Sequence, residues 1–190
     1  MTQAPDWFTQ ALAVRPRERF VQAPGCRIHV SEWGDPRAPA LVLVHGGGAH
    51  THWWDFIAPF LSGEWRVVAL DLGGMGESER RGQYSLDTFA AEVAAVVESV
   101  GESAVLVGHS LGGAVCLRTA ATWPDRVRGF VMADSPLHPP GFRFPGTGRN
   151  PLRQTKRRYA SREAVLGRFR LLPEQACENR YIVDYIAGHS

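Results

Sequence analysis

The feature that most constrains the fold is an alternation of short apolar runs with longer helical patterns between residues 26 and 135. Residues 40–44 (ALVLV) and 104–107 (AVLV) are continuously apolar, as strands buried on both faces are. Residues 86–100 carry apolar side chains at three- and four-residue spacings, which predicts an amphipathic helix. We therefore expect an α/β fold, with a mostly parallel sheet covered by helices on both faces.

Three more segments are predicted to complete this sheet. Residues 26–33 alternate apolar and polar side chains, which indicates an outer strand, and residues 66–71 and 127–133 are the other two. Ser85 is suited to cap the start of the predicted helix, and Gly101 its end.

A glycine-rich turn joins a buried strand to a helix at residues 108–112 (GHSLG). The pattern G-x-S-x-G in this context predicts a nucleophile elbow, a strained turn that exposes the serine hydroxyl beside a helix N-terminus. Ser110 is thus the candidate nucleophile. The alternative is a glycine-rich turn with a surface serine.

A second glycine segment, residues 45–48 (HGGG), directly follows the buried strand at 40–44. Glycines at such a place allow backbone N–H groups to approach an anionic intermediate closely. We predict that Gly47 and Leu111 donate these N–H groups as an oxyanion hole. Taken alone, the segment could equally be a plain strand-to-helix turn.

With a third segment, residues 71–78 (DLGGMGES), the order of motifs resembles the α/β-hydrolase superfamily over residues 26–135. The resemblance implies a structural role for Asp71. Serine in place of aspartate at the elbow favours attack by Ser110 on an ester-like or other acyl bond of a small molecule. Hydrolysis of carbon–carbon bonds and cofactor-free perhydrolysis by the same machinery remain open. No cofactor or metal is implied.

The resemblance also implies an acid and then a histidine after the serine. His138 and His189 are the histidines after Ser110, and neither follows a buried strand. Asp134 ends a strand and is the candidate acid, with a turn-capping carboxylate as the alternative. We therefore expect a C-terminally incomplete hydrolase. The alternative from another class is a non-catalytic binding or assembly module.

Two regions are predicted. The resemblance implies that residues 1–135 form the hydrolase core and that residues 136–190 form a helical lid after the sixth strand. Residues 136–190 contain helical patterns at about 162–172 and 174–188. If the last strands of the family are missing, the strand from Val127 has an exposed edge through which chains can associate.

Composition restricts the partners. A net charge of +2 gives no broad field for nucleic acid or anionic membranes, so a small-molecule substrate is expected. The first twenty residues contain no apolar run of the kind found in signal peptides or membrane spans, which favours a cytoplasmic protein. Three widely separated cysteines indicate neither a disulfide framework nor a zinc site.

Overall fold

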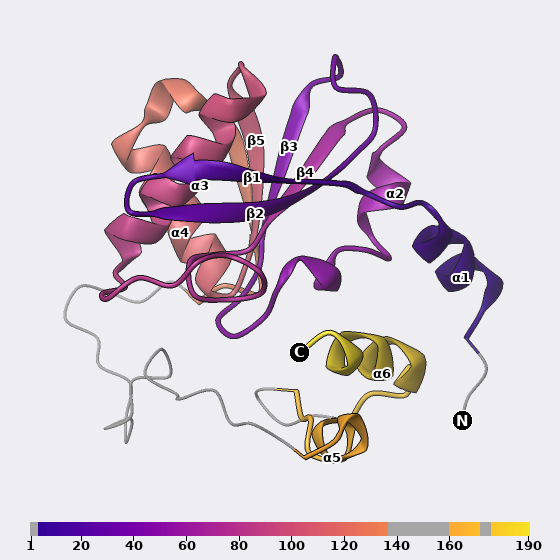
Figure 1. The fold of residues 1–190 in the computed structure, drawn as a ribbon. Helices are drawn as coiled ribbons and strands as arrows, with labels where there is room; N and C mark the ends of the chain where they lie inside the picture. Colours follow the sequence, from indigo (N-terminus) through magenta and orange to yellow (C-terminus); the bar gives the residue numbers. More distant parts are fainter. Residues whose placement is uncertain (1–3, 137–159, 172–175) are drawn as a thin grey trace.

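The computed structural model describes residues 4–136, 160–171 and 176–190. Its centre is a six-stranded sheet in the order β1-β2-β4-β3-β5-β6 (Figure 1). The strands are β1 (Arg17–Ala23), β2 (Cys26–Trp33), β3 (Ala40–Val44), β4 (Arg66–Leu70), β5 (Ala104–His109) and β6 (Val127–Ala133).

The sheet is mixed. β4, β3, β5 and β6 run parallel to one another, whereas β1 pairs antiparallel with β2, and β2 antiparallel with β4. The predicted mostly parallel α/β fold is confirmed. The interpretation of residues 26–33 as the outer strand is wrong, because β1 covers that edge and leaves β2 almost wholly buried.

Buried charge ties β1 to the rest of the sheet. Glu32 on β2 is 5% exposed, and its carboxylate pairs with Arg17 and Arg19 of β1 and with Arg66 of β4. Although burial opposes this effect, the hydrogen bond from Arg66 and the charges of Arg66 and Arg19 lower the pKa of Glu32. The charged residues of β1 therefore complete the sheet rather than form a solvated tail.

Helices cover both faces of the sheet. α3 (Leu86–Val100) and α4 (Leu111–Thr122) pack on one face, and α2 (Ala58–Leu61) packs on the other. The other described helices are α1 (Asp6–Ala13), α5 (Arg162–Leu166) and α6 (Arg180–Gly188), with 3-10 turns η1 (Thr51–Trp53) and η2 (Pro124–Arg126). The predicted caps of α3 are confirmed: the Ser85 hydroxyl accepts the Thr88 N–H, and Gly101 has φ 84°. Among the described residues, no helix combines the length and apolar character that a membrane span needs.

The C-terminal helices are shorter than predicted, and α6 joins a small apolar core apart from the sheet. α6 packs with α1 around Phe8, Phe56 and Ile186. In Figure 1, α5 and α6 lie beside each other, beyond the carboxyl end of β3 and near α1. Residues 137–159, with His138, and residues 172–175 lie outside the described ranges.

β6 is the last strand of the described sheet, and its described partner is β5 alone. Phe130 and Val131 point to opposite faces of this strand, and they are 39% and 53% exposed. Association through this edge stays a prediction.

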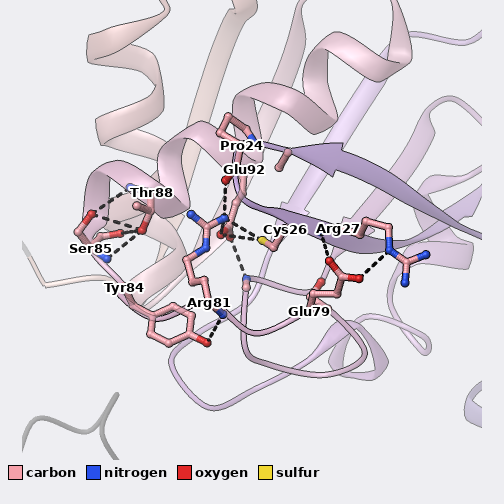
Figure 2. A network of polar contacts seen from close by, with 12 residues as sticks. Pro24, Cys26, Arg27, Glu79, Arg81, Tyr84, Ser85, Thr88 and Glu92 are labelled. Atoms are coloured by element: carbon pink, nitrogen blue, oxygen red, sulfur yellow. Dashed lines mark hydrogen bonds and ion pairs between the residues drawn. The ribbon is translucent and has the colours of Figure 1, made fainter.

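A buried ion pair fixes the segment that follows β4. Glu92 on α3 is fully buried; its Oε1 lies 2.7 Å from Nη2 of Arg81, and its Oε2 accepts the Gly73 N–H at 2.8 Å. Figure 2 shows Arg81 reaching over both Glu92 and Cys26. Burial raises the pKa of Glu92, while Gly73 and Arg81 counteract this rise.

We expect Arg81→Ala to lower the free energy of unfolding by about 3 kcal/mol near neutral pH, because it leaves a buried carboxylate without its cation. Loss of Arg81 also pushes the Glu92 pKa further above its unfolded value. The folded variant then takes up a proton at higher pH than the unfolded chain. The loss in free energy of unfolding, relative to the unaltered chain, should therefore shrink as the pH falls. Urea unfolding at several pH values measures both effects.

The control is Arg118→Ala, because Arg118 pairs with Asp87 on the surface. We expect this variant to lose about 0–1 kcal/mol. Equal losses in the two variants would contradict the role given to the Arg81–Glu92 pair.

Candidate active site

Ser110 occupies a strained turn between β5 and α4. Its backbone has φ 52° and ψ −116°, and Asp134 is the other non-glycine residue with positive φ in the described ranges. The Ser110 N–H donates to the carbonyl of Ala133 at 3.1 Å, which ties the turn to the end of β6. The Ser110 hydroxyl makes no hydrogen bond to any described residue. This is the geometry predicted for a nucleophile elbow.

The glycines around Ser110 are required by close packing. A Cβ on Gly108 would collide with the backbone of Gly112 and Gly113, and one on Gly112 with the carbonyls at the end of β3. The first turn of α4 therefore lies directly against the backbone of two strands, with no room for a side chain.

The glycine segment after β3 lies beside the elbow. A Cβ on Gly46 would be 3.3 Å from the Cβ of Ser110, and one on Gly47 would be 3.7 Å from Cδ2 of Leu111. The structure thus brings Gly47, Ser110 and Leu111 together. The donor role of the Gly47 and Leu111 N–H groups stays a prediction.

His45 orients this glycine segment. Its Nε2 accepts the Leu72 N–H at 3.0 Å, so the proton is on Nδ1, which donates to the Gly46 carbonyl at 2.7 Å. Burial lowers the pKa of His45 and keeps the ring neutral. Because the Gly46 carbonyl and the Gly47 N–H belong to one planar peptide, His45 also sets the direction of that N–H.

Asp71 organises the loops near the site, as the resemblance implies. It is 1% exposed and accepts hydrogen bonds from the Thr51 N–H, the Glu77 N–H and the His29 ring, at 2.7, 3.0 and 2.9 Å. Burial opposes ionisation, but these donors lower the pKa of Asp71. Its described hydrogen-bond partners lie on β2 and on the segments that follow β3 and β4.

The candidate acid and base are less well placed for catalysis at Ser110 than the two glycine segments are. Asp134 is exposed and directly follows Ala133, so it lies near the elbow, but its role stays a prediction. His189 lies at the end of α6, where its Nδ1–H donates to the Tyr185 carbonyl at 2.8 Å. His109 stacks on Trp53, with 6.2 Å between ring centroids. No described histidine forms a hydrogen bond with the Ser110 hydroxyl.

The sequence did not predict a polar cluster formed by His52, Asp55 and Tyr185. His52 Nδ1 lies 2.7 Å from Oδ2 of Asp55, and the hydroxyl of Tyr185 donates to the same oxygen at 2.5 Å. The three-residue spacing of His52 and Asp55 was the available signal, whereas Tyr185 is distant in the chain. In the described ranges, no group of three or more histidine, cysteine or carboxylate residues is arranged to hold a metal ion.

Comparison with known proteins supports the fold that carries this site. A family model described as alpha/beta hydrolase fold matches residues 39–172. Epoxide hydrolase 4 of Mus musculus is 33% identical over 122 residues, which cover 62% of this chain and 34% of that protein. Pimeloyl-[acyl-carrier protein] methyl ester esterase of Aeromonas hydrophila subsp. hydrophila is 38% identical over 113 residues, which cover 58% of this chain and 43% of that protein.

Among solved structures, a thioesterase domain from the curacin biosynthetic pathway superposes with a TM-score of 0.60 at 30% identity. The superposition covers 64% of this chain and 47% of that one. The chain therefore spans less than half the length of each of these three relatives.

We expect Gly112→Ala to lower the free energy of unfolding by about 1–3 kcal/mol, because the new methyl group must push α4 away from β3. Gly129→Ala is the matched control, since a Cβ at that position would meet nothing within 4 Å. Thermal and urea unfolding compare the two variants. If the two alanines had the same effect, close packing would not be the reason for glycine at the elbow.

Proposed function

The chain belongs to the α/β-hydrolase fold family, and from this premise we propose that it carries the nucleophile and oxyanion hole of a serine hydrolase. The substrate class that we propose is an ester-like or other acyl bond of a small molecule. The observation that carries the proposal is the backbone of Ser110, held at φ 52° with its hydroxyl unpaired by described residues. Strain of this kind persists where the surrounding structure enforces it, which is common at active sites.

In the proposed reaction, the Ser110 oxygen attacks a carbonyl carbon while a base removes the hydroxyl proton. The carbonyl oxygen becomes an oxyanion beside the N–H groups of Gly47 and Leu111, which stabilise it. When the intermediate collapses, the leaving group takes up the proton that the base removed from Ser110. It departs as an alcohol, a thiol or an amine. Water then attacks the carbonyl carbon of the acyl-enzyme, the ester bond to Ser110 breaks, the carboxylic acid leaves, and the serine oxygen takes back a proton.

The identity of the elbow residue favours acyl over epoxide chemistry. The names of the relatives include both an epoxide hydrolase and an esterase. Epoxide opening in this superfamily uses a carboxylate nucleophile that forms an alkyl ester with the enzyme. This chain has serine at the elbow, which forms an acyl-enzyme with a carbonyl substrate.

The base is the open part of the proposal. His45 cannot serve, since both its ring nitrogens are engaged with the backbone in a buried place. A non-catalytic binding module is therefore the second candidate. It is favoured by the absence of a hydrogen bond between the Ser110 hydroxyl and any described histidine.

We also propose that α5 and α6 belong to a lid over the site. This proposal is supported by the position of α6, which packs on the segment that follows the oxyanion glycines, beyond the carboxyl end of β3 (Figure 1). In α/β folds, ligands bind outside the carboxyl ends of the strands.

Labelling with a fluorophosphonate probe tests the serine hydrolase proposal. We expect covalent labelling of the chain at Ser110, located by peptide mass spectrometry, and no labelling of Ser110→Ala. Ser135→Ala is the control: its hydroxyl is nearby but already donates towards the Gly108 and Ala133 carbonyls. This variant should label like the unaltered chain.

Labelling of the folded chain at no more than the rate of a free serine hydroxyl would contradict the proposal for this chain and favour the binding module. Circular dichroism of the same sample verifies that the chain is folded. Rapid labelling at a residue other than Ser110 would overturn the assignment of the nucleophile.

A further inference from the structure

The segment at residues 50–56 contacts α6 through packing of aromatic rings and through hydrogen bonds. The proposed chemistry does not use these contacts. Asp55 accepts from both His52 and Tyr185, and the ring of His189 lies over that of His52 with 4.1 Å between centroids. Tyr185 also packs against Phe56, at 6.3 Å between centroids. α6 is thus docked by specific polar contacts in addition to apolar packing.

The hydrogen bonds at the end of the chain define the tautomer of His50. The hydroxyl of Ser190 donates to the Ile186 carbonyl at 2.9 Å, so it accepts from His50 Nε2, which lies 3.1 Å away. His50 therefore carries its proton on Nε2. Its Nδ1 is buried and has no hydrogen-bond partner among the described residues.

This tautomer makes the docked state incompatible with a charged His50. The second proton would have to go on Nδ1, where it would be a buried donor without an acceptor. The ring is only 4% exposed while α6 is docked, so water solvates the charge poorly. Undocking of α6 removes Ser190 from the ring and lets water reach it.

We propose that α6 is a pH-sensitive latch, docked on residues 50–56 when His50 is neutral and released when His50 takes up a proton. The segment that it holds starts two residues after the glycines at 45–48, and its Trp53 stacks on His109 beside Ser110. Release of α6 therefore uncovers the segment at residues 50–56, which lies beside the site. The latch requires no chemistry at Ser110.

The electrostatic surroundings of His50 agree in sign with release by acid. Burial, and then the neighbouring His52, lower the pKa of His50 to about 4, while the charge of Asp71 acts in the opposite direction. His45 and, from α6, His189 add to the lowering. A neutral histidine with a depressed pKa stabilises the docked state above the unperturbed value of 6.5, and this stabilisation is lost progressively as the pH falls towards about 4.

His52 does not cancel this effect. Its hydrogen bond to Asp55 raises its pKa, so the docked and released states both carry a proton on His52 in acid. The charges of Asp71 and Glu18 act on His52 in the same direction as Asp55. Its contribution to docking is lost as the pH rises through the raised pKa, which lies outside the acid window of His50.

Hydrogen exchange of the whole chain, read by mass spectrometry on peptides from α6, tests the latch. After correction for the intrinsic pH dependence of exchange, protection of α6 should fall by up to about tenfold per pH unit below pH 6.5, as a single linked proton requires. Peptides from β3 and β4 should stay protected over the same range. Loss of protection in α6 and the sheet at the same pH would mean global unfolding and would overturn the latch.

The decisive variant is His50→Gln, whose side-chain amide can donate to Ser190 but cannot titrate. We expect α6 in this variant to stay protected without the acid slope. His109→Gln is the matched control and should keep the slope. A slope that persists in His50→Gln, or its absence from the unaltered chain, would overturn the proposal.

Ser190→Ala covers the case in which glutamine fails to dock α6. This variant removes the acceptor for His50 Nε2–H, so protection of α6 at neutral pH should fall several-fold while the acid slope remains. Protection equal to that of the unaltered chain at neutral pH would show that the His50–Ser190 contact does not hold the latch.

Discussion

Close contact between the first turn of α4 and the ends of β3 and β5 is the constraint on which the site depends. The contact is possible because Gly108, Gly112 and Gly113 have no side chains. It bends the chain so sharply that Ser110 must adopt a backbone with positive φ, at a cost of about 1–3 kcal/mol. The same contact leaves Ser110 half-buried, at the boundary of the packed interior.

Buried carboxylates hold the loops around this elbow. Asp71 collects N–H groups from two separate segments, and Glu92 holds the Gly73 N–H from the side of α3. A carboxylate has several acceptor positions, so one side chain can satisfy loop N–H groups that no strand or helix would pair. His45 adds a link between the glycine segment and Leu72. The loops are therefore fixed to the sheet by polar contacts, in places where a parallel sheet offers no backbone partners.

The parts of the fold that were predictable are those with local signals. The apolar runs of β3 and β5, the spacing along α3 and its caps at Ser85 and Gly101 each leave a pattern within a short window. β1 was not predicted because its sequence, RERFVQA, begins with three consecutive charged residues, which place charge on both faces of the strand. Its strand structure depends on Glu32, a buried residue of the next strand, which pairs with Arg17 and Arg19. Such a contact has no signature in the sequence of β1 alone.

In the site, too, the features with local sequence signals were predictable and those that depend on distant residues were not. The elbow and the glycine segment were identifiable because strained turns require glycine at fixed spacings, whereas the partners of the histidines depend on distant residues. Ser190 is 140 residues from His50, yet its hydroxyl defines which nitrogen of that ring carries the proton. Through Thr51, which lies next to His50 and is bound to Asp71, the docking of α6 is connected to the loop network around Ser110. A segment of ten residues, 46–55, thus joins the glycines after β3 to the residues that contact α6, and a change at either end acts on a backbone already fixed at its centre by Asp71.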